Sequence, residues 1–314
     1  MKKCLVIFTL ILLVLFSIFV GVKDLSLTSW NEENWFLFST VRLPRTLSLI
    51  LAGGILAVSG LVMQQLTQNK FLTPSTIGTA DSARVGMLVV MLFFPQANVL
   101  LRSTIAFLFA LCGTLMFFFL LRLFPEQDMT SMALVGLMFG NVIGAITTFF
   151  AYQLNLVQNI SSWLQGNFSL VMKNSYELLY LTIPLAFLLY FFAQQFTLIA
   201  LGDMQAKSLG VSVEVIRFLG VALIALAYAT VLVSVGNIPF LSVVIPNLIL
   251  LRLGDNLRKN LLPTAITGAI FLLFCDILSR VVIAPYEMNV SIISGIIGGV
   301  IFITLLIRES VVKS

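Results

Sequence analysis

Charged residues are scarce in this chain of 314 residues, where Asp, Glu, Lys and Arg together make up 10% and hydrophobic residues 60%. A soluble domain carries about 25% charged residues, with which it covers its surface. A chain with so few charged side chains cannot solvate a surface of this size in water. We therefore expect lipid to be the solvent for most of it.

Histidine is absent, and the three cysteines, Cys4, Cys112 and Cys275, lie far apart in the sequence. Imidazole ligands for zinc or haem are therefore excluded, and isolated cysteines predict neither a disulfide framework nor a metal site. Ser–His and Cys–His catalytic pairs are excluded as well. The Gly-rich loop ending in Lys-Ser/Thr that cradles ATP phosphates is also missing. We predict no catalytic residues, no metal and no cofactor.

The formal net charge of +5 does not indicate a nucleic-acid partner. The 18 lysines and arginines are scattered between apolar runs and form no basic stripe that a phosphate backbone could follow. Basic residues beside apolar runs are typical of the charges that orient a membrane protein.

Long apolar runs fill most of the sequence. About 20 helical residues cross a bilayer core of about 30 Å, and unbroken apolar runs predict helices rather than a barrel. The fold class predicted is an all-α polytopic membrane protein with a single transmembrane domain over residues 1–314. We predict ten spans: Cys4–Val22, Thr46–Leu66, Asp81–Phe94, Ser103–Phe124, Met132–Tyr152, Leu178–Gln194, Val215–Val235, Phe240–Leu253, Pro263–Ile283 and Ile292–Ile307.

The first run also resembles a signal peptide. It is longer than a usual signal-peptide core and no small-x-small cleavage site follows it, so we interpret it as a span. An even number of spans places both termini on one side. With both termini in the cytoplasm, that side carries twice as many of the 18 basic residues as the other, as the positive-inside rule requires.

Two connections are long. Tyr152–Glu177 contains the amphipathic stretch Ile160–Phe168 and would lie outside. Thr197–Glu214 would be cytoplasmic, and Leu201, Met204 and Leu209 with Ala206 can form one helical face there. This segment is either a helix lying on the bilayer surface or a docking helix for a cytoplasmic partner.

Arg42-Leu-Pro-Arg45 is the most informative short motif. Pro44 suits a first helical turn, so we expect both arginines at the outer end of the second span. Arg280, at the outer end of the ninth span, would add a third cation at that level. The three are either interface arginines that extend toward water or a cationic rim that binds carboxylates of an external partner.

Only two acidic residues lie in the predicted spans. Asp81 begins a helix and is expected to be its N-cap. Asp276 precedes Arg280 by four residues, the spacing of an ion pair on one helix face. Neither is a free ionisable group at the membrane midplane, which a proton- or sodium-coupled carrier needs. Energy for transport would then come from another chain, or the protein is a passive channel.

Taken in order from residue 42 to the C-terminus, several stretches resemble the FecCD-type permeases that import iron–siderophore complexes and cobalamin. They are Arg42–Arg45, Gly53–Gln64, Asn69–Gly78, Leu201–Gly210, Phe240–Pro246, Leu261–Pro263, Asp276–Arg280 and Glu287–Gly299. No single stretch is decisive, but the set is specific.

The resemblance implies the architecture of a type II ABC importer permease in the bacterial cytoplasmic membrane. A first span at 4–22 would precede two inverted repeats, at about 46–152 and about 215–307, separated by the sixth span at 178–194 and a coupling segment at 197–214. The permease would pair with itself or with a sister subunit around one path. Two ATPase subunits would dock below, and a periplasmic or lipid-anchored binding protein above.

The same resemblance implies roles for particular residues. Arg42, Arg45 and Arg280 would receive acidic residues of the binding protein. Thr130 and Ser131 fall where such proteins narrow their cytoplasmic gate. The segment that couples to the ATPase would include Leu201, Gly202, Asp203, Ala206, Leu209 and Gly210.

One position departs from the family pattern. Relatives commonly have His after Pro246, where this chain has Asn247, so we assign that site no role. The Asn form resembles a branch that transports catechol-type or related ferric siderophores. Import of a ferric siderophore by alternating access is therefore the predicted function. Cobalamin or haem import by the same architecture and an ion-coupled secondary carrier remain as alternatives.

Overall fold

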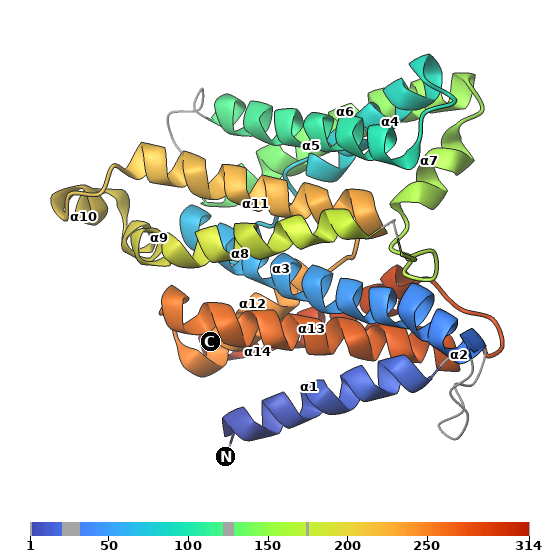
Figure 1. Ribbon diagram of the computed structural model, residues 1–314. Coiled ribbons are helices and arrows are strands. Elements are labelled where there is room, and N and C mark those ends of the chain that lie inside the picture. Colours follow the sequence, from blue (N-terminus) through green and yellow to red (C-terminus); the bar gives the residue numbers. More distant parts are fainter. Residues whose placement is uncertain (1, 21–31, 122–128, 174–175, 314) are drawn as a thin grey trace.

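The computed structural model describes residues 2–20, 32–121, 129–173 and 176–313. These residues form helices, with one isolated β-bridge between Gln165 and Asn237. The all-α prediction is confirmed (Figure 1). The helices are α1 (Lys2–Phe19), α2 (Glu32–Leu37), the π-helical turn η1 (Phe38–Arg42), α3 (Leu43–Thr67), α4 (Thr79–Phe93), α5 (Val99–Leu121), α6 (Met129–Gln153), α7 (Val157–Leu164), the 3-10 turn η2 (Glu177–Leu181), α8 (Thr182–Phe191), α9 (Ala193–Ala200), α10 (Asp203–Ser208), α11 (Val213–Val235), α12 (Leu241–Leu253), α13 (Leu257–Val281) and α14 (Val290–Lys313).

In the part of the chain that the structure describes, each predicted span coincides with a helix or with a bent pair of helices; the ends of two predicted spans, residues 21–22 and 122–124, lie outside that part. Within the described residues, six helices are long and apolar enough to cross a membrane. Two apolar helices are shorter: Leu5–Phe19, which is most of α1, and α12. The sixth predicted span is the bent pair: Glu177–Phe191 and Ala193–Ala200 meet at 54°. The count of ten crossings and the inverted repeats stay predictions.

The second span begins earlier than the predicted Thr46, as part of a helical run of 34 residues. The π-helical turn Phe38–Arg42 precedes Pro44. Proline has no N–H to donate to the carbonyl four residues back, which belongs to Thr40. That carbonyl instead accepts a hydrogen bond from the Lys173 backbone N–H at 3.1 Å. Pro44 therefore lies within a continuous helix. The Thr40 carbonyl that it leaves free binds the distant loop at Lys173.

Helix α3 lies at the centre of the bundle and packs on α13, α12, α11 and α9 (Figure 1). In the apolar stretch of the helical run that contains α3, 78% is buried inside the protein, compared with 22% for α14 and 28% each for α5 and α6. Small residues permit this close packing, because helices in lipid associate through contact rather than through a hydrophobic drive. A Cβ at Gly53 would lie 2.6 Å from the Gly268 carbonyl oxygen of α13. Hence α3 and α13 touch backbone to backbone.

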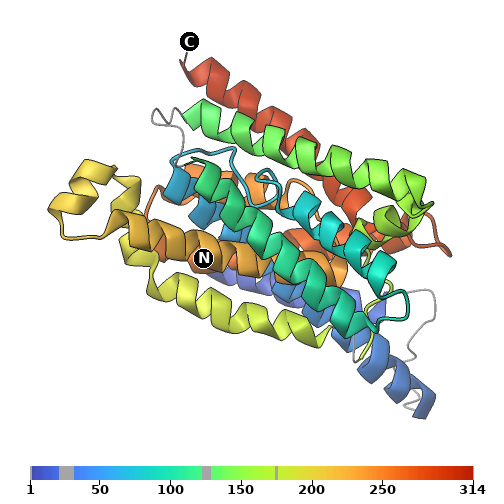
Figure 2. The same cartoon turned by 90° about the horizontal axis from the view of Figure 1, so that it is seen from above.

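The two ends of the bundle differ. Helix α10 projects from one end, and the chain termini lie toward the same end (Figures 1 and 2). Helices α2 and α7 lie at the opposite end (Figure 1). We refer to these as the α10 end and the α7 end. The predicted site residues divide between them.

We predict that Gly53→Ala destabilises the protein while Gly54→Ala does not. The added methyl group at Gly53 meets backbone that cannot move aside, which costs about 1–3 kcal/mol. At Gly54 the nearest atom would be 3.5 Å away, an ordinary contact. Thermal unfolding of both variants in detergent checks this, and equal melting temperatures would contradict the backbone contact.

Candidate functional sites at the two ends of the bundle

The predicted coupling segment forms a short helix at the α10 end. Gly202 and Gly210 flank it with φ angles of 116° and 80°, which only glycine adopts easily. Between them α10 makes one and a half turns, and the Gly202 carbonyl accepts a hydrogen bond from Ala206 N–H at 2.9 Å. The boundaries predicted from the two glycines are therefore correct.

The predicted apolar face of this segment is partly wrong. Ala206 is fully buried, whereas the side chains of Leu201, Met204 and Leu209 are exposed, Met204 by 85%. Ala206 faces the bundle because its carbonyl accepts hydrogen bonds from the N–H groups of Leu209 and Val211, which fold the chain back over it. The three large apolar side chains thus point outward, away from Ala206. Exposed apolar groups gathered at one tip are typical of an interaction site.

An ion pair ties α10 to the start of α11. The Arg217 guanidinium donates to an Asp203 carboxylate oxygen at 2.5 Å, and Asp203 is half-exposed. Asp203 also lies in the first turn of α10, where a carboxylate suits the helix dipole. A displacement of α10 would therefore act directly on α11.

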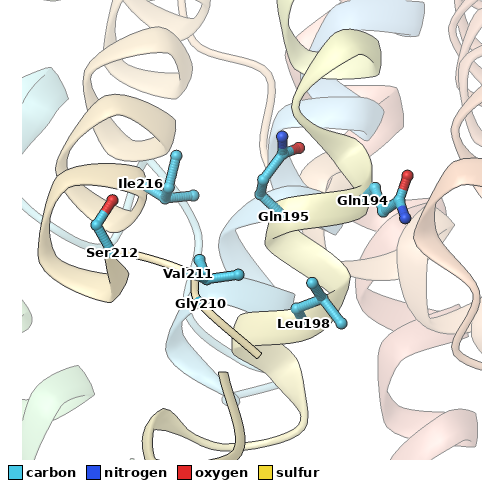
Figure 3. Close-up of a pocket in the computed structure, with 7 residues that line it drawn as sticks. All are labelled: Gln194, Gln195, Leu198, Gly210, Val211, Ser212 and Ile216. Atoms are coloured by element: carbon cyan, nitrogen blue, oxygen red, sulfur yellow. The ribbon is translucent and has the colours of Figure 1, made fainter. Parts of the chain in front are cut away.

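A pocket of about 420 Å³ opens between α9 and the start of α11. It is lined by Gln194, Gln195, Leu198, Gly210, Val211, Ser212 and Ile216. Figure 3 shows Gln195 directed into the space between the two helices and Gln194 on the far side of α9. The pocket lies just beyond the bend at Phe192, and Gly210, Val211 and Ser212, which join the predicted coupling segment to α11, form one of its walls.

Buried ion pairs dominate the α7 end. The Arg45 Nε and Nη2 atoms donate to Asp276 Oδ1 at 3.1 and 2.8 Å. Arg280 pairs with the other carboxylate oxygen, Oδ2, which confirms the predicted ion pair of Asp276 and Arg280. Arg280 Nη1 also donates to the carbonyl oxygens of Ser17 and Val20, each at 2.8 Å. One carboxylate thus joins α3 and α13, and Arg280 attaches α1.

The structure brings the three predicted rim arginines together and buries them, so the alternative of interface arginines that extend toward water is wrong; their docking role stays a prediction. Arg42, Arg45 and Arg280 are 8%, 4% and 4% exposed. Arg42 Nη1 shares the Val20 carbonyl with Arg280. A guanidinium removed from water needs charged and carbonyl partners to offset the lost hydration. Those partners come from this chain itself.

Glu287 and Ser169 complete the cluster, and sequence reasoning did not identify either. Arg45 Nη1 donates to Glu287 Oε2 at 2.8 Å, and Ser169 Oγ donates to the same oxygen at 2.5 Å. Burial alone would raise the pKa of Glu287, but hydrogen bonds from Ser169 and Arg45, with the charges of both arginines, lower that pKa below its ordinary value. Glu287 is therefore a carboxylate at neutral pH.

Three further positions singled out in the sequence remain to be placed. Asp81 is not an N-cap: Gly78 caps α4, and Asp81 pairs with Arg84 at 3.1 Å. Asn247 joins α12 to the loop after α3, because its side-chain amide donates to the Lys70 carbonyl at 3.1 Å. Thr130 and Ser131 lie in the first turn of α6, and their side chains are outside the described part of the structure.

Comparison with known proteins places the whole chain in one family. The family model described as the FecCD transport family matches residues 4–308. The chain belongs to the FecCD transport family. The resemblance seen in the sequence motifs is thereby confirmed. Members are transport permeases, so this FecCD chain is a multi-pass membrane permease rather than an enzyme.

Two relatives of the FecCD chain are named for siderophores. It is 43% identical to the petrobactin import system permease protein YclN of Bacillus subtilis, over 96% of each chain. It is 37% identical to the ferric-anguibactin transport system permease protein FatD of Vibrio anguillarum, over 93% of this chain and 94% of that one. The vitamin B12 import system permease protein BtuC of Vibrio cholerae is 30% identical, over 90% and 86%.

A solved structure has the same fold. It is described as an inward-facing conformation of a metal-chelate type ABC transporter, and it superposes with a TM-score of 0.85 at 24% identity. The match covers 98% of this chain and all of that chain. The type II importer permease fold predicted from the motifs is therefore confirmed.

We predict that Asp276→Asn strongly destabilises this FecCD permease. Arg45 and Arg280 would both lose a buried anionic partner, and breaking a buried ion pair costs about 3–5 kcal/mol. Asp255→Asn is the matched control, since the Asp255 side chain is exposed before α13. Thermal unfolding in detergent measures the stability of both variants. A similar small effect of the two substitutions would show that the buried Asp276 carboxylate contributes no more to stability than an exposed one.

Proposed function

We propose that this chain is the membrane-spanning permease of an importer for ferric siderophores. The observation that carries the proposal is its 43% and 37% identity, over nearly the full chain, to the petrobactin and ferric-anguibactin permeases. Relatives named for vitamin B12 and hemin are 30% and 31% identical. Cobalamin or haem import is therefore the second candidate, supported by weaker similarity. An ion-coupled secondary carrier has no support from these relatives.

The permease works with partners on three sides in this proposal. A second permease subunit, identical or a sister chain, completes the path, and the low burial of α5, α6 and α14 leaves helix faces on which another subunit or lipid can pack. Two ATPase subunits supply energy, because this chain has no phosphate-binding loop of its own. A periplasmic or lipid-anchored binding protein delivers the cargo.

The α10 end faces the cytoplasm in this arrangement, within the cytoplasmic membrane of a bacterium. Both termini lie toward that end, in keeping with the excess of basic residues assigned to the cytoplasmic side. Thr130 and Ser131, at the start of α6, would contribute to the cytoplasmic gate. The α7 end then faces outward and receives the binding protein.

Helix α10 is the proposed contact with the ATPase. The exposed Leu201, Met204 and Leu209 would enter an apolar groove on that subunit, as amphipathic helices commonly do. Movement of α10 would reach α11 through the ion pair of Asp203 and Arg217. The pocket between α9 and α11 would provide the space into which these helices move.

Docking of the binding protein is proposed for the arginine cluster of the α7 end. Arg42, Arg45 and Arg280 lie within one cluster there, and guanidinium groups bind carboxylates with good geometry. Because Asp276 is buried between Arg45 and Arg280, an incoming carboxylate would add to this cluster rather than find free arginines.

Deleting the gene should abolish uptake of radiolabelled iron supplied as ferric petrobactin, while leaving uptake of labelled cobalamin and haemin unchanged. Restoring the wild-type gene is the control. If iron uptake from the siderophore persists and cobalamin or haemin uptake falls, the second candidate replaces the first. A cell with no change in any of the three would refute the proposed function.

We predict that Met204→Glu prevents the ATPase from binding without unfolding the permease. Met204 is 85% exposed, so the substitution disturbs no internal packing but places a charge in the proposed apolar contact. Tyr286→Glu is the control, because Tyr286 is 75% exposed at the opposite end. Co-purification of the ATPase measures the outcome, and retention of the ATPase by the Met204 variant would contradict this role of α10.

A further inference from the structure

One of the two acidic partners of Arg45 is accessible from outside. The Asp276 side chain is 0% exposed, whereas that of Glu287 is 19% exposed. Glu287 lies in the loop between α13 and α14, beside Tyr286, whose side chain is 75% exposed. A carboxylate approaching Arg45 from solvent would therefore meet the position that Glu287 already occupies.

Glu287 also holds the loop that follows α7. Its Oε2 atom accepts hydrogen bonds from both Arg45 and Ser169, so one oxygen joins the arginine cluster to residues 165–173. We call residues 165–173 the strap. Losing this carboxylate from Arg45 would also remove the acceptor that positions Ser169.

The backbone of the strap bonds to three other elements of the α7 end. Asn167 N–H donates to the Val235 carbonyl at the end of α11, at 3.0 Å. The Gly166 carbonyl accepts from Ser291 N–H of α14 at 3.2 Å, and Lys173 N–H donates to Thr40 of η1. Phe168 beneath these contacts is fully buried. The strap thus closes this end of the bundle by bonding to α11, α14 and η1, and Glu287 is its side-chain link to Arg45.

We propose that Glu287 is an internal substitute for a docking partner's carboxylate and that it latches the strap closed. An acidic side chain of the external binding protein takes the Glu287 position on Arg45 Nη1. Glu287 then leaves, Ser169 loses its acceptor, and the strap is released from this side. This inference deepens the proposed function, because it assigns the residue through which docking opens the outer end.

The exchange explains how docking can act on the strap. Arg45 keeps Asp276 throughout and exchanges one carboxylate for another, so the number of its ion pairs does not change. The bond between Ser169 and Glu287 is the contact that is lost. A partner can shift a conformational equilibrium only through such a difference between the two states. Here the difference is whether the strap is attached to Arg45 through Glu287.

The latch can be tested without cargo. In a chain whose three native cysteines are replaced by alanine, Val171→Cys places a thiol in the strap at a position that is 4% exposed. The permease is reconstituted with its ATPase in lipid nanodiscs and treated with a membrane-impermeant maleimide. We expect Glu287→Gln and Ser169→Ala each to raise the labelling rate several-fold. Glu214→Gln is the matched control, because Glu214 is exposed in the first turn of α11 at the other end.

The double variant distinguishes a shared contact from general loosening. If Glu287 and Ser169 act through one hydrogen bond, the double variant labels no faster than the faster single variant. Multiplied effects, or unchanged labelling in both single variants, would overturn the latch. Thermal unfolding of each variant shows whether the fold is retained, and Ser169→Ala keeps the test valid if Glu287→Gln does not fold.

A second arm tests the exchange. Addition of the purified binding protein of the same importer should raise labelling in the wild-type background and have little further effect in the Glu287→Gln background. No change in the wild type, or an equal increase in both, would show that Glu287 is not displaced. These labelling readouts are separate from iron uptake. If the latch fails but siderophore uptake is normal, the proposed function stands. If siderophore uptake fails but the labelling results are as expected, the latch stands and the proposed cargo is wrong.

Discussion

The Asp276 carboxylate, shared by Arg45 and Arg280, is the interaction on which the α7 end depends. It is fully buried, and each of its oxygens accepts from a different guanidinium. In a medium of low dielectric, two arginines without this anion would repel each other and lack compensation for lost hydration. Because Arg45 belongs to α3 and Arg280 to α13, the carboxylate holds together the two helices that also meet at Gly53. Arg280 then fixes α1 through the carbonyls of Ser17 and Val20.

Helix α11 connects the two candidate sites physically. Its first residues follow the coupling segment, where Arg217 pairs with Asp203. At its other end the Val235 carbonyl accepts the Asn167 N–H of the strap. A helix of 23 residues is stiff over this length, so its two ends cannot move independently. The contact that we propose between α10 and a partner, and the closure that we propose for the strap, would therefore both act on this one helix.

The sequence predicted the helices well because apolar runs are local signals. The ion pair of Asp276 and Arg280 also followed from local spacing. What could not be predicted depends on tertiary contacts between segments far apart in the chain. To predict that Arg45 is buried, one would need to know that α13 brings Asp276 beside it. Glu287 had no local feature that marked it as a partner of Arg45. Pro44 was interpreted from the sequence as a residue of a first helical turn, whereas the hydrogen bond from Lys173 N–H to the Thr40 carbonyl depends on the fold.

Compensated arginines suit a site that must bind and release a partner repeatedly. Three unpaired guanidinium groups at the membrane surface would attract anions strongly, but their burial would be costly whenever the partner leaves. Asp276 and Glu287 lower this cost for Arg45 and Arg280, which are both paired with internal acids in this structure. In the docking that we propose, binding is an exchange of one carboxylate for another on Arg45, so that large opposing electrostatic terms cancel and small differences in the strap decide the direction. Such near-balance suits the reversible docking that we propose for this end of the bundle.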